Sequence, residues 1–514
     1  MRRVVGKRLG MIGGGAAVAA VSVVAGTLLA GGESGSIAAP HACRTAAHGA
    51  APQTGPAADR PVRTGAAPAA DFDGDGHPDI ALAGPAGDVG DSALAGIVAV
   101  AYGTSTGTDL GRCQRLTQGD PLIPGKPRGE AFFGFDTVAR DFDEDGYTDL
   151  AASVFEGCDP HVIIMWGSER GLTRAARVPG TDGSHVPWAT EPCLDEQLAA
   201  GDFDGDGHAD LVFGLGSERG LLKGPFLRDG SPAGTGRVPV PRAPDERADD
   251  MAYQELVAGD LNGDGIDDLV TFHNDDTGPE TVAWSELHWP VSYLQGGRDG
   301  FTQPDTVRLP DAAAGAVGDV DGDGFGDLVL SPRGGGVSRS SVTVVHGTES
   351  GPGTRTTTLD RDTPGVPGEE PGDEDGVFVA LDTGDVNGDG YADVVAGAPR
   401  AEVYAEPGPE EVLFFPGGKN GLTGRGARAF DERDVHGFAN SGHNFGRAAR
   451  LTDMDGDHRA DLVVTAPGNW EAPGSAWMLP GSAAGPLPQG ITQLHEGTFV
   501  GPGEWADLGS GIAR

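Results

Sequence analysis

Cysteine is scarce in this chain, which has only four in 514 residues: Cys43, Cys113, Cys158 and Cys193. That number is too low for a small disulfide-dense scaffold, and no two of them form the Cys-x-x-Cys pair of zinc sites and thioredoxin-like enzymes. Four widely spaced cysteines fit an exported, oxidised protein. We expect Cys158 to pair with Cys193 and Cys43 to pair with Cys113, although all three connectivities remain open.

Basic residues are also few. Lys and Arg total 36 against 77 Asp and Glu, which gives a formal net charge of −41. A surface this acidic repels phosphate backbones and anionic headgroups, so we expect no nucleic-acid or anionic-membrane partner. The 87 glycines and 38 prolines predict many turns and little helix.

Long hydrophobic runs are missing except near the start of the chain. Residues 11–30 are rich in Ala, Val, Gly and Leu and follow the basic residues Arg2, Arg3, Lys7 and Arg8. This pattern predicts a signal peptide over residues 1–38, exported by either the general or the twin-arginine route and cleaved after Ala30 or Ala38. The alternative is an uncleaved membrane anchor. After cleavage we expect no stable membrane span, and a secreted protein that is either free or associated with the cell envelope.

Familiar catalytic motifs are absent. The sequence has no G-x-S-x-G elbow, no H-E-x-x-H pair and no P-loop. Five histidines that we considered are scattered: His161, His273, His288, His436 and His443. We therefore predict no catalytic residue and no organic cofactor site.

What the chain does have is a repeated acidic loop. Residues 202–210 read Asp-Phe-Asp-Gly-Asp-Gly-His-Ala-Asp, with carboxylates at positions 1, 3, 5 and 9 and a turn glycine at position 6. Alternate side chains of a tight loop point inward, and the backbone carbonyl of position 7 adds another oxygen. Such an all-oxygen set suits a hard cation, calcium above all.

Seven such loops occur, so we expect up to seven calcium ions. The position-3 acid is replaced by asparagine only twice, and the position-6 glycine is replaced only by His458. Position 7 of each loop is included for its backbone carbonyl. The predicted ligands are Asp71, Asp73, Asp75, His77, Asp79, Asp141, Asp143, Asp145, Tyr147, Asp149, Asp202, Asp204, Asp206, His208, Asp210, Asp260, Asn262, Asp264, Ile266, Asp268, Asp319, Asp321, Asp323, Phe325, Asp327, Asp385, Asn387, Asp389, Tyr391, Asp393, Asp453, Asp455, Asp457, Arg459 and Asp461.

These loops are not EF-hands, because position 12 is never the bidentate glutamate and short β-favouring runs follow position 9. Successive loops start 58 to 70 residues apart, a period typical of propellers and other arrays. Each period carries three or four short strands, such as residues 411–417. After a flexible Ala/Pro/Gly-rich linker over residues 39–67, we predict an all-β fold over 68–514.

The repeats resemble the FG-GAP family. Phe133-Gly134 and Phe445-Gly446 precede the second and last loops, and Gly397-Ala398-Pro399 follows the sixth. The resemblance implies a seven-bladed β-propeller like that of the integrin α-subunit head, with calcium in hairpin loops on one face and ligands often bound on the other. It also implies a type found in exported bacterial proteins.

Function and ring closure follow as expectations. We expect a monomeric interaction or adhesion module that binds an extracellular protein or glycan. The alternatives are an exported hydrolase or polysaccharide lyase on the same scaffold and a structural envelope protein. Because the tail over 506–514 resembles the segment that precedes a loop, we expect it to pair into the first blade, rather than a local strand starting at Gly65.

Overall fold

The computed structural model describes most of the chain beyond residue 69. The described residues are 70–104, 107–155, 160–181, 197–215, 218–239, 252–274, 290–304, 306–333, 341–368, 378–398, 410–436, 444–467, 474–499 and 508–514. The chain divides into two compact units, residues 1–40 and 41–514, and all described residues belong to the second. The predicted signal peptide and linker lie outside the described residues.

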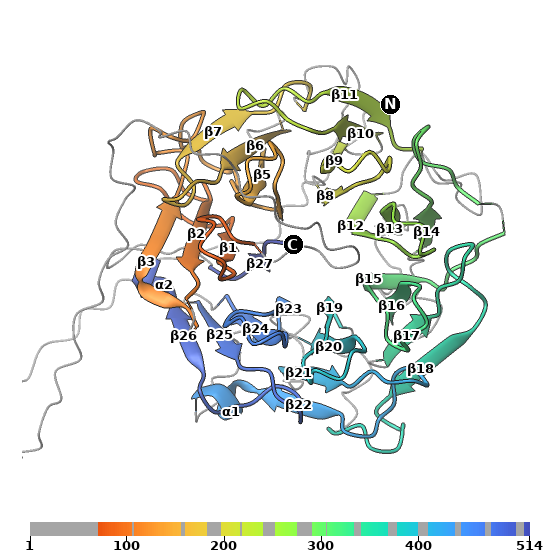
Figure 1. Ribbon diagram of the computed structural model, residues 1–514. Helices are drawn as coiled ribbons and strands as arrows, with labels where there is room; N and C mark the ends of the chain where they lie inside the picture. Colours follow the sequence, from red (N-terminus) through yellow and green to blue (C-terminus); the bar gives the residue numbers. More distant parts are fainter. Residues whose placement is uncertain are drawn as a thin grey trace, which may run out of the picture. The chain divides into compact units, whose positions relative to one another are not determined.

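The second unit is a ring of seven antiparallel sheets (Figure 1). Each sheet is a blade, numbered here by the order of its acidic loop. Its first strand lies toward the centre of the ring and its last toward the outside. The seven-bladed all-β propeller predicted from the sequence is confirmed.

Six blades have four strands, and blade 4 has three among the described residues. From inside to outside, the strands of blades 1 to 4 are β27 (Gly511–Ile512), β1 (Ile80–Gly84), β2 (Ile97–Tyr102) and β3 (Asp109–Leu116); β4 (Thr137–Arg140), β5 (Asp149–Phe155), β6 (Pro160–Trp166) and β7 (Arg174–Arg177); β8 (Leu198–Gly201), β9 (Asp210–Leu215), β10 (Glu218–Lys223) and β11 (Gly234–Arg237); and β12 (Ala252–Gly259), β13 (Asp268–Asn274) and β14 (Val291–Leu294).

Blades 5 to 7 follow the same plan, and two short helices accompany outer strands. Their elements are β15 (Ala312–Gly318), β16 (Asp327–Pro332), β17 (Ser341–Val345) and β18 (Thr356–Asp360); β19 (Ala380–Gly384), β20 (Asp393–Ala398), β21 (Glu411–Phe415), β22 (Arg428–Asp431) and α1 (Glu432–His436); and β23 (Ala449–Thr452), β24 (Asp461–Ala466), β25 (Ser475–Leu479), β26 (Thr492–His495) and α2 (Glu496–Phe499).

The hydrophobic pattern of a strand reflects its place in the blade. The second and third strands read as nearly continuous apolar runs, as in β5 and β21, and every residue of those two strands is buried. Both faces of such a strand pack against a neighbouring blade, so alternation disappears. An outer strand such as β11 alternates between exposed and half-buried residues, because one face meets water.

The apolar core is divided into seven clusters, each of which lies between two adjacent blades. The cluster around Val98 and Ile163 joins blades 1 and 2, and the cluster around Val395 and Leu462 joins blades 6 and 7. Blades 7 and 1 share a cluster that includes Met478 and Ile97. Since every interface between neighbours has its own core, the ring is closed.

The tail of the chain closes the ring, as expected from the sequence. Strand β27 pairs antiparallel with β1, with Ile512 opposite Leu82 and Gly511 opposite Ala83. The tail also reaches blade 2, because the Ala139 amide donates to the Arg514 carbonyl at 2.7 Å. The Arg514 guanidinium pairs with Glu255 of blade 4 at 2.7 Å. The tail thus contributes the inner strand of blade 1 and contacts two further blades.

Candidate metal centres

The seven acidic loops fold alike. In blades 2 to 7 the loop joins the two inner strands of the blade, and in blade 1 it leads into β1. In loop 202–210, the position-1 carboxylate accepts the Gly205 amide at Oδ1 and the Gly207 amide at Oδ2, at 2.8 and 2.9 Å. The Asp206 carboxylate accepts the His208 amide at 3.0 Å. The position-6 residue needs a left-handed backbone, and Gly207 has φ of 90°. These bonds turn the carboxylates inward around a common centre.

The position-9 aspartate also accepts two backbone hydrogen bonds in every blade. In blade 5, Asp327 accepts the Val320 amide at Oδ2, at 3.0 Å, and the Gly347 amide at Oδ1, at 2.9 Å. The same two bonds, from position 2 of the loop and from a glycine beyond the third strand, recur in the other six blades. The side chain therefore ties the loop to the strand beside it.

In several of the acidic loops, carboxylate oxygens lie close enough to one another to bind a single ion. In several loops, three candidate ligand atoms lie within 4.8 Å of one another. The sets include Asp71, Asp73 and Asp79; Asp141, Asp143 and Asp149; Asp202, Asp204 and Asp206; and Asp319, Asp321 and Asp323. Hard oxygen donors in a flexible loop fit calcium, whose ligands lie at about 2.3–2.6 Å. The donor chemistry predicted from the sequence is therefore assembled, at four loops at least.

Comparison with known proteins agrees with this geometry. A model of the FG-GAP repeat matches residues 196–240, 378–406 and 445–474, and a model of an FG-GAP-like repeat matches residues 134–213. The chain contains FG-GAP repeats. Integrin alpha-PS2 of Drosophila melanogaster is 28% identical over 181 residues, which are 31% of this chain and 12% of that protein. The match thus spans a small part of that relative.

A solved structure of an Agrocybe aegerita lectin is a distant likeness. It is described as showing specific recognition of non-reducing terminal N-acetylglucosamine. The match covers 84% of this chain and 94% of the lectin, with 14% identity and a TM-score of 0.48.

The position-9 aspartates of the FG-GAP loops carry strongly perturbed pKa values. Burial, as the largest cause, raises the pKa of Asp79 to about 8 and those of Asp210, Asp268, Asp327 and Asp393 to about 7. Backbone amide donors lower these pKa values, and the neighbouring carboxylates raise them. Without a cation, the negative charges of each loop repel one another and favour protonated carboxyl groups. A bound divalent ion would instead favour the ionised carboxylates and lower their pKa values.

Backbone hydrogen bonds join four pairs of neighbouring loops. In these pairs the amide at position 8 donates to the position-1 carbonyl of the preceding loop, as Thr148 does to Asp71 at 3.0 Å and Ala392 to Asp319 at 2.9 Å. Position-7 side chains also lie over the preceding loop: a Cβ atom on Gly322 would clash with the Tyr391 ring. The position-7 residues, included for their carbonyls, thus also join adjacent blades through their side chains.

One contact between neighbouring loops differs in chemistry. Six loops have glycine at position 4, but loop 141–149 has Glu144, whose φ is 60°. Its carboxylate forms a short hydrogen bond with the His208 ring of the next loop. The position-4 pattern was not used in the sequence analysis, although it could have been read from the aligned loops.

Basic side chains that the sequence analysis missed reach four of the loops. Arg112 pairs with Asp73, Lys223 with Asp204 at 2.6 Å, and Arg355 with Asp321 at 2.8 Å. Arg228, from the next blade, pairs with Asp143 at 2.6 Å and also with Asp145. All four pairs include the position-3 carboxylate. These partly exposed cations can move toward water when another cation takes their place.

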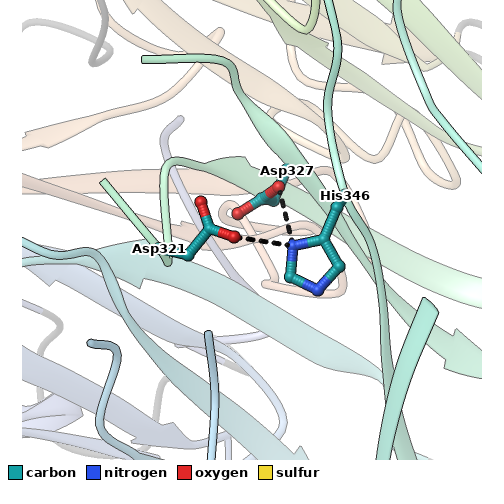
Figure 2. Close-up of side chains that lie close together, drawn as sticks. All are labelled: Asp321, Asp327 and His346. Carbon is teal, nitrogen blue, oxygen red and sulfur yellow. Dashed lines mark ion pairs between the residues drawn. The ribbon is translucent and has the colours of Figure 1, made fainter. Parts of the chain in front are cut away.

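Blade 5 also brings a histidine to its loop (Figure 2). His346 Nδ1 lies 3.3 Å from Asp321 Oδ2 and 3.3 Å from Asp327 Oδ1. Burial is the main cause that lowers the pKa of His346, which favours the neutral ring. His346 was not among the histidines weighed in the sequence analysis.

The last loop closes like the others despite its substitution. His458 takes the left-handed conformation with φ of 70°, and its amide donates to Asp453 Oδ2 at 2.9 Å, as Gly207 does to Asp202. Trp166 and Trp477 are buried core residues.

The described residues bear only in part on the expected disulfides and on the expected absence of a membrane span. Cys113 is disulfide-bonded, and the other three cysteines lie outside the described residues. Within the described ranges, no helix has the length and apolar character needed to cross a membrane.

Proposed function

We propose that this FG-GAP propeller is a secreted, calcium-stabilised interaction module that binds an extracellular protein or glycan as a monomer. The observation that carries the proposal is the set of seven similar acidic loops on one side of the ring, four neighbouring pairs of which are joined by backbone hydrogen bonds. FG-GAP repeats are typical of extracellular proteins, where millimolar calcium supports sites of modest affinity.

Calcium would be held by the side-chain oxygens of positions 1, 3, 5 and 9 and the carbonyl of position 7. Its charge would offset the mutual repulsion of the carboxylates, which is greatest where they are buried. Because each loop leads into a buried strand and touches a neighbouring blade, bound calcium would stiffen the scaffold rather than take part in a reaction. A rigid scaffold with variable edges suits binding.

An exposed aromatic group at the other end of the blades supports a binding role for that end. Phe135 precedes β4 and Phe155 ends β5, so both lie away from the acidic loop that joins these strands. Phe135 is 39% exposed, and its ring packs edge-on against Phe155 at a centroid distance of 5.0 Å. A rigid, partly exposed aromatic ring can anchor an apolar side chain or stack on a sugar.

The test is a binding screen of the full chain, loaded with calcium, against arrayed glycans and purified extracellular proteins. We expect saturable binding that Phe135→Ala weakens and chelator abolishes. Leu227→Ala is the matched control, because Leu227 is the other large exposed hydrophobic among the described residues and lies in a turn on the acidic-loop side. Depolymerisation of an arrayed polysaccharide would instead support the hydrolase or lyase. Binding that neither Phe135→Ala nor chelator reduces would contradict the proposal.

A further inference from the structure

One position in each blade lies directly beside the acidic loop, immediately before the glycine that donates to the position-9 aspartate. Its residue varies from blade to blade, and only blade 5 has a histidine there. In order of the blades, the residues are Tyr102, Trp166, Lys223, Gln295, His346, Pro416 and Pro480. In blade 3 the lysine ammonium pairs with the loop. In blade 5 an imidazole nitrogen reaches the corresponding loop.

The three side chains of the blade 5 cluster are withdrawn from water. The side chains of His346, Asp321 and Asp327 are 3%, 5% and 0% exposed. His346 Nε2 lies 3.1 Å from the Thr357 hydroxyl oxygen, which can accept its proton. When the ring proton is on Nε2, the lone pair of Nδ1 is directed at the two carboxylates, to which dashed lines join Nδ1 in Figure 2.

Two buried polar atoms of this cluster are left without a hydrogen bond. Among the described residues, neither His346 Nδ1 nor Asp321 Oδ1 has a hydrogen-bond partner. A lone pair that faces two carboxylates is repelled unless a cation lies between them. Arg355 pairs with Asp321 Oδ2, but its side chain is 56% exposed and it is bound to the carboxylate rather than to the ring.

The distances fit a small metal ion. Zinc binds histidine nitrogen and carboxylate oxygen at about 2.0–2.2 Å, which separates neighbouring ligand atoms by roughly 3.0–3.5 Å in octahedral to tetrahedral geometry. The two Nδ1–oxygen separations of 3.3 Å fall within that range. We propose that His346, Asp321 and Asp327 form a mixed nitrogen and oxygen site for a divalent transition metal of the zinc class.

The donor set separates this site from the other six loops. Calcium takes oxygen ligands almost exclusively, whereas imidazole suits zinc and its first-row neighbours. Blade 5 would then retain zinc when calcium fills the remaining loops. The inference does not depend on the protein's ligand, since it concerns one blade and is read out by metal content.

The experiment uses the full chain, stripped with chelator, refilled with excess calcium and dialysed against zinc at low micromolar concentration. Metal content is measured by mass spectrometry, and cobalt replaces zinc as a spectroscopic probe. We expect His346→Gln to retain one equivalent of zinc less than wild type and to lose the visible cobalt absorption. His161→Gln is the matched control, because His161 is equally buried at the other end of the corresponding strand in blade 2.

A second variant, Asp321→Asn, guards against misfolding of the histidine variant, and circular dichroism confirms that each protein is folded. We expect this variant also to lose one zinc equivalent. The proposal is overturned if wild type retains no zinc in the presence of calcium. It is equally overturned if both variants bind as much zinc as wild type and His161→Gln.

Discussion

Leu508→Ala should open the ring at its closing strand. Leu508 is 2% exposed and belongs to the apolar cluster shared by blades 1 and 7, which includes Leu82 of blade 1 and Val463 of blade 7. Just after it, the Gly509 amide donates to the Ala83 carbonyl at 2.8 Å. The leucine therefore anchors the strand that completes blade 1.

The magnitude follows from burial. Truncating a fully buried leucine to alanine costs about 2–5 kcal/mol, and the cost is larger where the surroundings cannot collapse into the cavity. Neighbouring blades are held apart by their own sheets, so we expect a value of about 3–4 kcal/mol. Leu227→Ala, at a leucine that is 64% exposed, should change the stability by less than about 0.5 kcal/mol.

Urea unfolding in excess calcium, followed by tryptophan fluorescence, measures both variants against wild type. A chain that ends at residue 507 should lose still more stability, because it also lacks the bonds from the tail to β1 and to blade 2. It should aggregate through the exposed edge of β1. Equal unfolding midpoints for Leu508→Ala, the shortened chain and wild type would refute closure by the tail.

Three further predictions concern the acidic loops. Chelation should lower the melting temperature by many degrees, with magnesium a poor substitute for calcium; an unchanged melting curve would contradict calcium binding. His458→Gly should raise the free energy of unfolding by roughly 1 kcal/mol, because His458 has a left-handed backbone that glycine adopts more easily. Gly207→Ala should lower it by a similar amount for the same reason, since a Cβ atom at Gly207 would meet nothing within 4 Å. In chelator, burial raises the pKa of Asp79 to about 8 and that of Asp210 to about 7, so the folded state binds more protons than the unfolded state and loses stability as pH rises through these values. Calcium must displace those protons, so its effect on melting should be larger at pH 8.5 than at pH 5.5; an equal or larger effect at pH 5.5 would contradict this.

The sequence predicted what is encoded locally and repeatedly. The loop positions, the strands around them and the number of blades follow from a pattern that recurs within nine residues and again after about sixty. Closure by the tail was also predictable, because residues 506–514 resemble the segment before a loop while the first loop lacks one. In each case the residues that define the local sequence pattern are also the residues that the fold needs at those positions, so the sequence alone predicts the structure there.

Contacts between distant residues were not predictable in this way. Arg112 lies 39 residues after Asp73, and Arg228 reaches Asp143 from the next blade, 85 residues away. Neither spacing repeats, so no period reveals it. His346 was detectable in principle, since it occupies a fixed place before Gly347, but its meaning depends on which atoms face it.

The distribution of these cations shows how the loops are balanced. At the ligand positions 1, 3, 5 and 9, blades 1, 2, 3 and 5 have four carboxylates and one paired Arg or Lys, which leaves three negative charges. Blades 4 and 6 have asparagine at position 3, through Asn262 and Asn387, and so have three negative charges at these positions. Blade 7 has four carboxylates and Arg459, whose guanidinium lies 3.7 Å from Asp457. At the ligand positions, the seven loops thus reach the same formal charge by two different routes, while Glu144 and Asp267 add one carboxylate each outside those positions. A divalent ion would leave each set of ligand positions with a single negative charge, so the ligand sets match in electrostatics as well as in shape, and the histidine of blade 5 changes the type of ligand without changing that charge.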